Sequence, residues 1–261
     1  MTTVDLRYDD RIAVVTLDRA PVNALSSEMY EDLAEALDEV AGAHRVSAVV
    51  LRSASSKVFC AGADVRELGA LTGAQAHTAD VRRQELARSV FDNLLNLPQP
   101  TIAVLDGPAI GAGAVIASCC DLRISSTRAS FRLPEVDVGR CGGARHLMRH
   151  LPQGIVRRMY FTAEMLDARQ AEKYGFVELV PEGEDPLEVS FDRARQIAAK
   201  SPTALRLGKR ALNESEALSV TEGYATEQQY TLKLARTADA AEAILARREG
   251  RPPNFTGASA E

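Results

Sequence analysis

Hydrophobic positions in the first part of the chain gather into short runs separated by turn residues. Runs this short, β-branched and almost continuously apolar are typical of strands that are buried on both faces of a sheet. The predicted strands are "IAVVTL" (12–17), "VSAVVLRS" (46–53), "TIAVLDG" (101–107), "CDLRISS" (120–126) and, as the last of them, "GFVELVP" (175–181).

The segments between these runs have helical periodicity. From Ser26 to Ala43 the apolar residues Met29, Leu33 and Leu37 recur at helical spacing, with acidic residues between them. A longer amphipathic helix is predicted over 75–97, ended by "LPQP". Strands that alternate with helices in this way indicate an α/β fold.

After about residue 142 the pattern changes. From Pro186 onward the chain predicts helices, interrupted near "SPTA" (201–204). We expect a core over 1–195 that binds the ligand and performs catalysis. A helical region over 196–261, too small for a core of its own, would pack on that core or on another subunit.

Composition excludes several classes of protein. Hydrophobic residues make up 46% of the 261 positions and charged residues 26%, which is ordinary globular usage. The net charge of −5 offers no overall basic field for nucleic acid. No signal pattern opens the chain and no apolar run approaches the roughly 18 residues of a membrane span. The four cysteines lack a CxxC pair, so we expect reduced, buried thiols, no metal site and a cytoplasmic protein.

Two glycine- and alanine-rich turns carry the candidate chemistry. "FCAGAD" (59–64) and "GPAIGAGA" (107–114) each pass from a strand end, through small residues, to a helix start. Small residues let a ligand approach the backbone, and the first N–H groups of a helix are free to donate. Two such turns facing each other would direct two N–H donors at one oxyanion. Close packing alone would also explain the glycines, whereas a phosphate loop is disfavoured because no Lys-Ser/Thr ending follows.

Several segments together resemble the crotonase superfamily of enoyl-CoA hydratases and isomerases. They are "TLDRAPVNALS", "VVLRSASSKVFCAGAD", "DGPAIGAGAVIASCCDLRIS", "FRLPEVDVG" and "EGRPPNFTG", and they span nearly the whole chain. The resemblance implies a spiral of ββα units with a C-terminal helical part, assembly as a homotrimer or hexamer, and acyl-CoA thioesters as substrates. No metal or redox cofactor is implied, because CoA arrives as part of the substrate.

The resemblance also assigns residues to the site. Ala61 and Ala112 would supply the two N–H groups of an oxyanion hole, although glycine is usual at position 112. Ala61, Gly62, Ala63 and Asp64 would line the CoA path, with Gly111 beside the second donor and Lys57 as a phosphate contact.

Hydratases of this family typically have a glutamate where this chain has Val115, and a second one that matches Glu135. Adding water to a 2-enoyl thioester uses two carboxylates, one for the water and one for the α-carbon. Moving a double bond from position 3 to position 2 needs a single base. With Val115 apolar, we therefore favour isomerisation with Glu135 as the acid/base.

Other readings remain open at this point. If the segment is extended, the Asp137 side chain points to the same side as that of Glu135 and could supply the second carboxylate that hydration needs. Alternatively, Asp137 is an acidic residue on the surface. The aspartate of dienoyl-CoA isomerases would fall at Gly143, which disfavours that activity. Arg140 either meets a carboxylate on an unusual substrate or faces solvent.

The remaining alternatives concern the reaction class. They are an acyl-CoA lyase or hydrolase that uses the same enolate pocket, a non-catalytic acyl-CoA-binding protein, and a dinucleotide-binding protein.

Overall fold

Two β-sheets organise the computed structural model, which describes residues 2–69 and 73–257. Within those residues the larger sheet has six strands in the order β1-β2-β3-β4-β6-β9. The first pair is antiparallel and the later pairs are parallel. The strands are β1 (Val4–Asp9), β2 (Ile12–Leu17), β3 (Ala48–Ser53), β4 (Thr101–Leu105), β6 (Leu122–Ser125) and β9 (Glu178–Leu179). A smaller sheet joins β5 (Ala109–Ile110), β7 (Ser130–Arg132) and β8 (Leu166–Asp167).

The predicted strands all appear in the larger sheet, and the α/β class is confirmed. The strand β1 was not predicted. Only Val4 of its six residues is buried, because β1 lies at the sheet edge, so its sequence has no apolar run. An edge strand with one solvated face leaves a weak signal of this kind.

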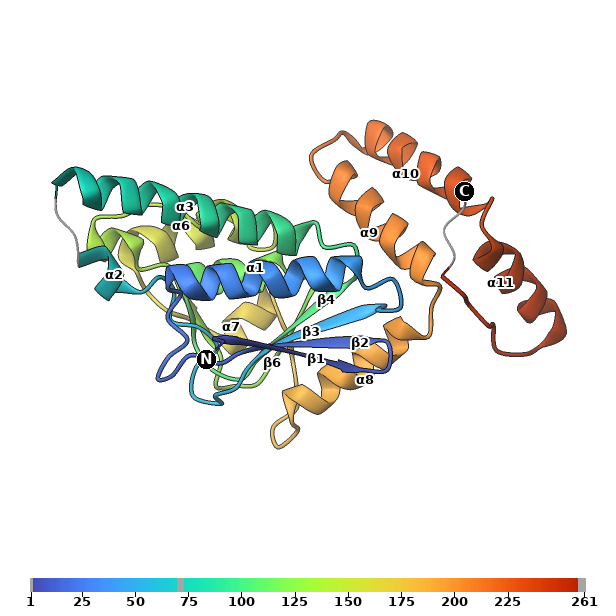
Figure 1. Ribbon diagram of the computed structural model, residues 1–261, viewed down its shortest axis with the longest axis horizontal. Coiled ribbons are helices and arrows are strands. Elements are labelled where there is room, and N and C mark those ends of the chain that lie inside the picture. Colours follow the sequence, from blue (N-terminus) through green and yellow to red (C-terminus); the bar gives the residue numbers. More distant parts are fainter. Residues whose placement is uncertain (1, 70–72, 258–261) are drawn as a thin grey trace.

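Helices cover both faces of the larger sheet (Figure 1). On one side lie α1 (Ser27–Gly42) and α3 (Gly73–Leu95), and on the other lies α8 (Pro186–Ala198). Alternate residues of a single strand enter the two layers: Val49 joins the core under α1, whereas Val50 joins the core under α8. This two-sided burial explains why the strands read as continuous apolar runs.

Local signals set the helix boundaries. The helix α1 begins after Ser26, whose hydroxyl accepts a hydrogen bond from the Met29 N–H at 3.2 Å. The other described helices are α2 (Val65–Gly69), α4 (Ala112–Cys119), the 3-10 helix η1 (Glu135–Val138), α5 (Ala144–Leu147), α6 (Gln153–Thr162), α7 (Ala168–Lys173), α9 (Pro202–Ser215), α10 (Val220–Leu234) and α11 (Ala238–Glu249).

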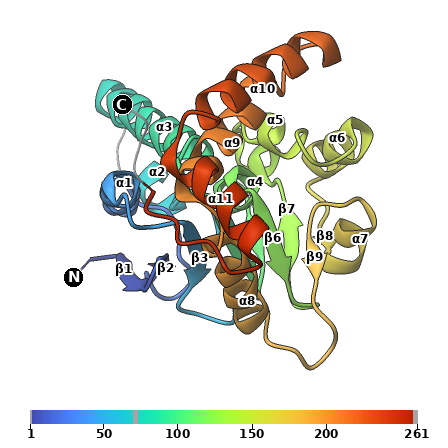
Figure 2. The same cartoon turned by 90° about the vertical axis from the view of Figure 1, so that its right-hand side faces the viewer.

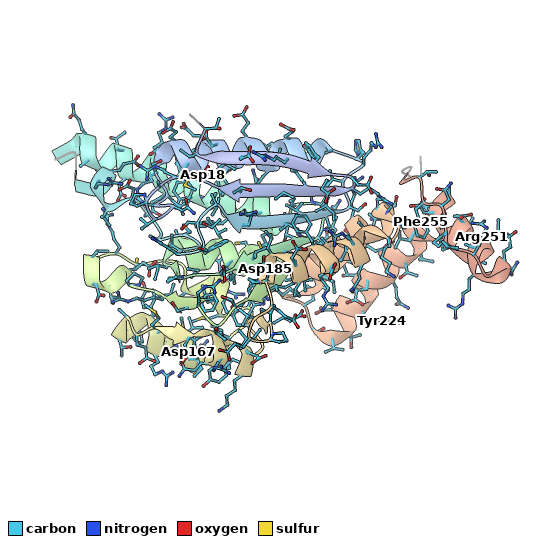
Figure 3. The ribbon with its side chains drawn as sticks, turned by 90° about the horizontal axis from the view of Figure 1, so that it is seen from below. Asp18, Asp167, Asp185, Tyr224, Arg251 and Phe255 are labelled. Atoms are coloured by element: carbon cyan, nitrogen blue, oxygen red, sulfur yellow. The ribbon has the colours of Figure 1, made fainter. Side chains whose placement is uncertain are left out.

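The last three helices extend beyond one end of the sheet (Figure 1), so that α11 lies in front of the strands when the molecule is seen from that end (Figure 2). Seen from below, Tyr224 and Arg251 lie on this extension, at the opposite end of the molecule from Asp167 (Figure 3). Lys209 of α9 ties the extension to the core, since its buried Nζ contacts an Asp121 carboxylate oxygen at 2.7 Å. The predicted limit at residue 195 falls inside α8, and the extension begins with α9.

No helix in the described ranges is both long enough and apolar enough to cross a bilayer.

Candidate active site

The two small-residue turns meet at the carboxyl ends of neighbouring parallel strands. One follows β3 and the other follows β4, so both leave the same edge of the sheet. Backbone hydrogen bonds join them directly: the Ile110 N–H donates to the Cys60 carbonyl, and the Phe59 N–H donates to the Pro108 carbonyl, each at 2.9 Å. The turns therefore form one rigid wall.

Glycine is required where the turns touch. At Gly62 the backbone has a φ of +84°, and a Cβ would lie 2.7 Å from the Ile110 carbonyl oxygen and 3.4 Å from the Ala112 nitrogen. At Gly111 the φ is +52°, and a Cβ would lie 2.8 Å from the Glu135 Oε1 atom. Both positions disfavour a side chain on conformational and steric grounds. Close packing of the two turns therefore requires glycine at both positions.

The structure corrects one of the two predicted N–H donors. The Ala61 N–H already donates to the Val22 carbonyl at 3.0 Å and is not free to bind a ligand. The Ala63 N–H has no acceptor in the described part of the chain, and Ala63 is only half-buried on the cavity wall. Side-chain pattern cannot reveal this difference, because it depends on which neighbouring carbonyl each amide faces.

The structure leaves the Ala112 N–H, the second predicted donor, available to a ligand. Ala112 is the first residue of α4, where backbone N–H groups have no partner within the helix. The preceding Gly111 N–H is occupied by the Arg132 carbonyl at 2.8 Å. Ala63 and Ala112 thus present free amides from the two turns to one cavity. Donors placed in this way can bind a carbonyl oxygen on which negative charge develops.

Glu135 lies at the start of η1 with its carboxyl group against Gly111. Burial raises the pKa of this carboxyl group above the usual range, opposed by a backbone hydrogen bond. Its Oε2 atom is buried and has no hydrogen-bond partner among the described residues. A half-buried carboxylate with an unused oxygen and increased proton affinity is suited to general acid/base chemistry.

Val115 stands one turn into α4 and is fully buried on the same wall. Gly143 packs against it, since a Cβ there would be 2.9 Å from Val115 Cγ2 and 3.9 Å from Glu135 Oε1. Among the described residues that line the cavity, Glu135 is the only carboxylate. The predicted residues that share this cavity are Ala61, Gly62, Ala63, Gly111, Ala112, Val115 and Glu135.

Asp137 does not join Glu135. The segment is a 3-10 helix rather than extended, so side chains two residues apart diverge by about 120° at three residues per turn. Asp137 instead accepts a hydrogen bond from Arg132 Nη2 at 2.9 Å and lies half-exposed outside the cavity. The idea of a restored second acid was therefore wrong for this conformation.

Two further predicted residues lie outside the cavity wall. Asp64 is buried beneath two arginines: Arg19 Nη2 lies 2.9 Å from its carboxylate and Arg66 Nε lies 3.2 Å from it. Burial alone would raise the pKa of Asp64, but these hydrogen bonds outweigh burial and hold it below the usual range. Lys57 is exposed on the preceding loop. Arg19 and Arg66, which motif reasoning missed, therefore form a cationic group at Asp64, the last residue of the first turn.

The cavity has a cationic side that the sequence indicated only through Arg140. Arg83 of α3 also lines it, with 8% of its side-chain surface exposed, and Tyr30 of α1 is fully buried beside it. Burial raises the pKa of the Tyr30 hydroxyl, which therefore stays neutral. A single arginine in a long amphipathic helix gives no signal in the sequence, because its burial depends on what the helix packs against.

The cysteines divide into two groups. Cys60, Cys119 and Cys120 are buried, as expected, and burial raises the pKa of each thiol. Cys141 is exposed and lines the cavity, which corrects the expectation that all four are buried. Among the described residues no three His, Cys, Asp or Glu side chains gather as a metal site would require.

Known proteins resemble this chain in sequence and in fold. The family model for enoyl-CoA hydratase/isomerase matches residues 7–258. The chain is 32% identical over 255 residues to a mitochondrial methylglutaconyl-CoA hydratase of Mus musculus, covering 94% of this chain and 80% of the relative. It is 35% identical over 223 residues to a (7aS)-7a-methyl-1,5-dioxo-2,3,5,6,7,7a-hexahydro-1H-indene-carboxyl-CoA hydrolase of Mycobacterium tuberculosis. That match covers 85% of this chain and 89% of the relative.

The fold agrees as well. A crystal structure of an enoyl-CoA hydratase from Bacillus anthracis superposes with a TM-score of 0.91 at 28% identity, covering 98% of this chain and all of the other. The architecture and the match along nearly the whole sequence lead to the same conclusion: the chain belongs to the enoyl-CoA hydratase/isomerase family of the crotonase superfamily and is an enzyme that acts on acyl-CoA thioesters.

Proposed function

We propose that the protein isomerises 3-enoyl-CoA to 2-enoyl-CoA, with Glu135 as its single acid/base. The observation that carries the proposal is the contrast between two positions on one cavity wall. Glu135 offers a buried, unpartnered carboxylate oxygen, whereas Val115, where hydratases of this family typically have a second glutamate, is apolar and fully buried.

The reaction follows from the positions of these groups. The thioester oxygen accepts hydrogen bonds from the Ala63 and Ala112 amides. The Glu135 carboxylate removes a proton from the α-carbon, and the electron pair moves to the thioester oxygen to form a dienolate. The amides hold the developing charge, a contribution of about 3–4 kcal/mol for each donor in other enzymes. Glu135, now protonated, returns the same proton to the γ-carbon, and the double bond is left conjugated with the thioester.

This chemistry neither gains nor loses electrons or water, so it needs no redox cofactor, and the two amides supply the stabilisation at the thioester oxygen that a Lewis acid would otherwise provide. The raised pKa of Glu135 assists the first step, because a carboxylate with increased proton affinity is a stronger base, and the carboxylic acid formed there is the proton donor of the second step. Arg19 and Arg66, which pair with Asp64 at the end of the first turn, are suited to binding the anionic groups of CoA.

A panel of 3-enoyl-CoA and 2-enoyl-CoA substrates tests the proposal. Wild-type protein should convert the former to the latter, and the Glu135→Gln variant should lose the activity. The proposal fails if 3-enoyl-CoA is untouched while 2-enoyl-CoA gains water at a rate that depends on Glu135. Binding of NAD in preference to CoA would overturn the assignment of the turns.

Hydration is the second candidate, and the names of relatives favour it, because several of them are hydratases. The hydrolase relative adds water-dependent cleavage as a variant of the same enolate chemistry. Either reaction requires a group that activates water, and within the described cavity only Glu135 is an acid. The same substrate panel separates these reactions by their products.

We also propose that the C-terminal helices form contacts between subunits in a homotrimer or hexamer. Large apolar side chains are exposed on them, with Leu212 66% exposed on α9, Val220 92% and Leu232 60% on α10. Exposed apolar surface of this kind is typical of interfaces. Light scattering coupled to size exclusion measures the mass, and a monomer at micromolar concentration would refute this assembly.

A further inference from the structure

Two arginines form part of the boundary between the active-site cavity and a neighbouring cavity. Arg83 comes from α3 and Arg140 follows η1, and both line the two cavities. Asp80, one turn before Arg83, accepts a hydrogen bond from each arginine on a different carboxylate oxygen. The separation of Asp80 and Arg140 by 60 residues shows that the tertiary fold brings this group together.

The group has an excess of positive charge. Two guanidinium groups share one carboxylate, and both Asp80 oxygens are already occupied. The hydrogen bonds from the arginines hold the pKa of Asp80 below its usual range, so this carboxylate stays ionised. Glu67, which also lines the neighbouring cavity, accepts hydrogen bonds from the Ser27 N–H and hydroxyl instead. One positive charge is therefore unmatched within the group.

Arg83 retains unused donors. Its Nη2 donates to Asp80 at 2.5 Å, while its Nε and Nη1 have no acceptor in the described part of the chain. A guanidinium presents five N–H groups in a rigid fork, and the Arg83 side chain, which is 8% exposed, lies on the cavity wall. Donors that face a cavity and have no protein partner favour an incoming acceptor that carries negative charge.

The surroundings define where this acceptor would sit. The active-site cavity is also lined by Tyr30 of α1, Phe91 of α3 and Val115, which together are suited to a hydrocarbon chain. The Tyr30 hydroxyl makes no hydrogen bond within the described residues, and burial keeps it neutral, so it can donate. The cavity thus combines an apolar stretch, beside Glu135, with a cationic wall.

We propose that the acyl group of the substrate ends in a free carboxylate, which Arg83 binds with the help of Arg140. The preferred substrates are then CoA monothioesters of dicarboxylic acids. This inference rests on the proposed acyl-CoA site, but it does not depend on whether the reaction is isomerisation or hydration.

Attachment of α3 to the loop after η1 is the other role open to this group. The hydrogen bonds of Asp80 to the two arginines would be enough for that structural role. A structural role therefore leaves the unused donors of Arg83 unexplained. A purely structural role predicts that variants lose affinity for all acyl-CoA molecules alike. A carboxylate site predicts that they lose affinity only for acidic ones, and this difference separates the two roles.

Binding measurements on saturated ligands avoid the reaction altogether. Adipyl-CoA and hexanoyl-CoA have the same chain length and differ in the terminal carboxylate, and glutaryl-CoA with pentanoyl-CoA and suberyl-CoA with octanoyl-CoA extend the series. Isothermal titration at low salt should show that at least one dicarboxylic member binds about ten- to a hundredfold more tightly than its neutral partner, which is the range for hydrogen bonds to charged groups.

The Arg83→Met variant should abolish this preference while leaving the affinity for the neutral acyl-CoA within about twofold. The matched control is Arg82→Met, because Arg82 is the neighbouring arginine on α3 and pairs with Glu31 on the surface. It should retain the full preference. If Arg83→Met does not fold, Arg83→Lys keeps the charge without the fork and should reduce the preference by part of its value.

Each outcome has one meaning. If neither neutral nor acidic acyl-CoA binds, the proposed acyl-CoA site itself fails. If neutral acyl-CoA binds and no dicarboxylic ligand binds better at any length, the carboxylate site is wrong while the proposed function stands. A preference that persists in Arg83→Met would also overturn the assignment to Arg83.

Discussion

The two sides of the active-site cavity are built from different parts of the polypeptide. On the side that we propose binds the thioester, the groups are backbone amides of Ala63 and Ala112, held by turns that touch at Gly62. On the side that we propose binds the acyl chain, called the acyl side below, they are side chains, chiefly Arg83 and Arg140. A backbone donor survives replacement of its own side chain, so alanine serves at position 112. A side-chain site changes with every substitution, which leaves the acyl side free to set substrate preference.

This contrast predicts that the acid/base variant has the largest effect. Glu135→Gln removes proton transfer and leaves both amides in place, so kcat should fall by about a thousandfold. Affinity for saturated acyl-CoA should stay within a few fold. Steady-state kinetics and titration calorimetry measure the two quantities, and a residual rate above a tenth of wild type would contradict the role of Glu135.

The pH dependence of the wild-type enzyme should report the same group. The base acts only when ionised, and burial raises the pKa of Glu135. The value of kcat/KM should therefore be constant at high pH and fall as the pH drops through a pKa above the ordinary carboxyl range. An inflection at or below that range would show that Glu135 is solvated in the free enzyme.

A change at the contact between the turns should come next in size. In Gly62→Ala the new Cβ would meet the Ile110 carbonyl oxygen, shifting the turns apart, and kcat should fall about a hundredfold as an amide donor is misplaced. The control is Gly175→Ala, because Gly175 also has a positive φ, +74°, but no atom within 4 Å of the Cβ position. Both variants should lose stability from backbone strain, Gly62→Ala more so because its Cβ also meets the Ile110 carbonyl oxygen, and equal activity in the two would refute the importance of the contact.

Restoring a carboxylate on the thioester side should have a smaller effect. Val115→Glu should raise the rate of 2-enoyl-CoA hydration by about tenfold, less than a positioned acid contributes elsewhere, because Gly143 packs against the site. The unfolding free energy should fall by about 1–3 kcal/mol from burying a polar group. Val115→Gln matches the shape without the acid, and equal hydration by both variants would show that the carboxylate is not used.

Alkylation on the acyl side should have the smallest effect. N-ethylmaleimide should react first with Cys141, the exposed cysteine on the cavity wall, whereas the other three are buried. The rate should fall about two- to fivefold as the chain is displaced, since small misplacements slow catalysis. Saturating acyl-CoA should protect the thiol, and Cys141→Ser should be insensitive; inhibition that persists in that variant would place the effect elsewhere.

Much of the site could be predicted because it lies in short segments with local constraints. The small-residue turns, the helix start at Ala112 and the Pro134–Glu135 pair all stand next to strands whose apolar runs are unmistakable. The adjacency of β3 and β4 then brings the turns together. Errors arose where one hydrogen bond or one turn of backbone decides the outcome, as at Ala61, whose amide is bonded to Val22.

The sequence by itself determined the α/β class, the two turns, the candidate acid Glu135 and the apolar residue Val115, because periodicity, glycine placement and short motifs are local properties. Only the tertiary structure decided which amide is free, that Asp137 diverges from Glu135, and that Arg83 is buried beside Arg140. Those outcomes depend on the direction of a backbone group or on a contact between residues far apart in the chain. Neither is encoded in the spacing of apolar residues, since the same amphipathic helix can bury or expose an arginine according to what packs against it.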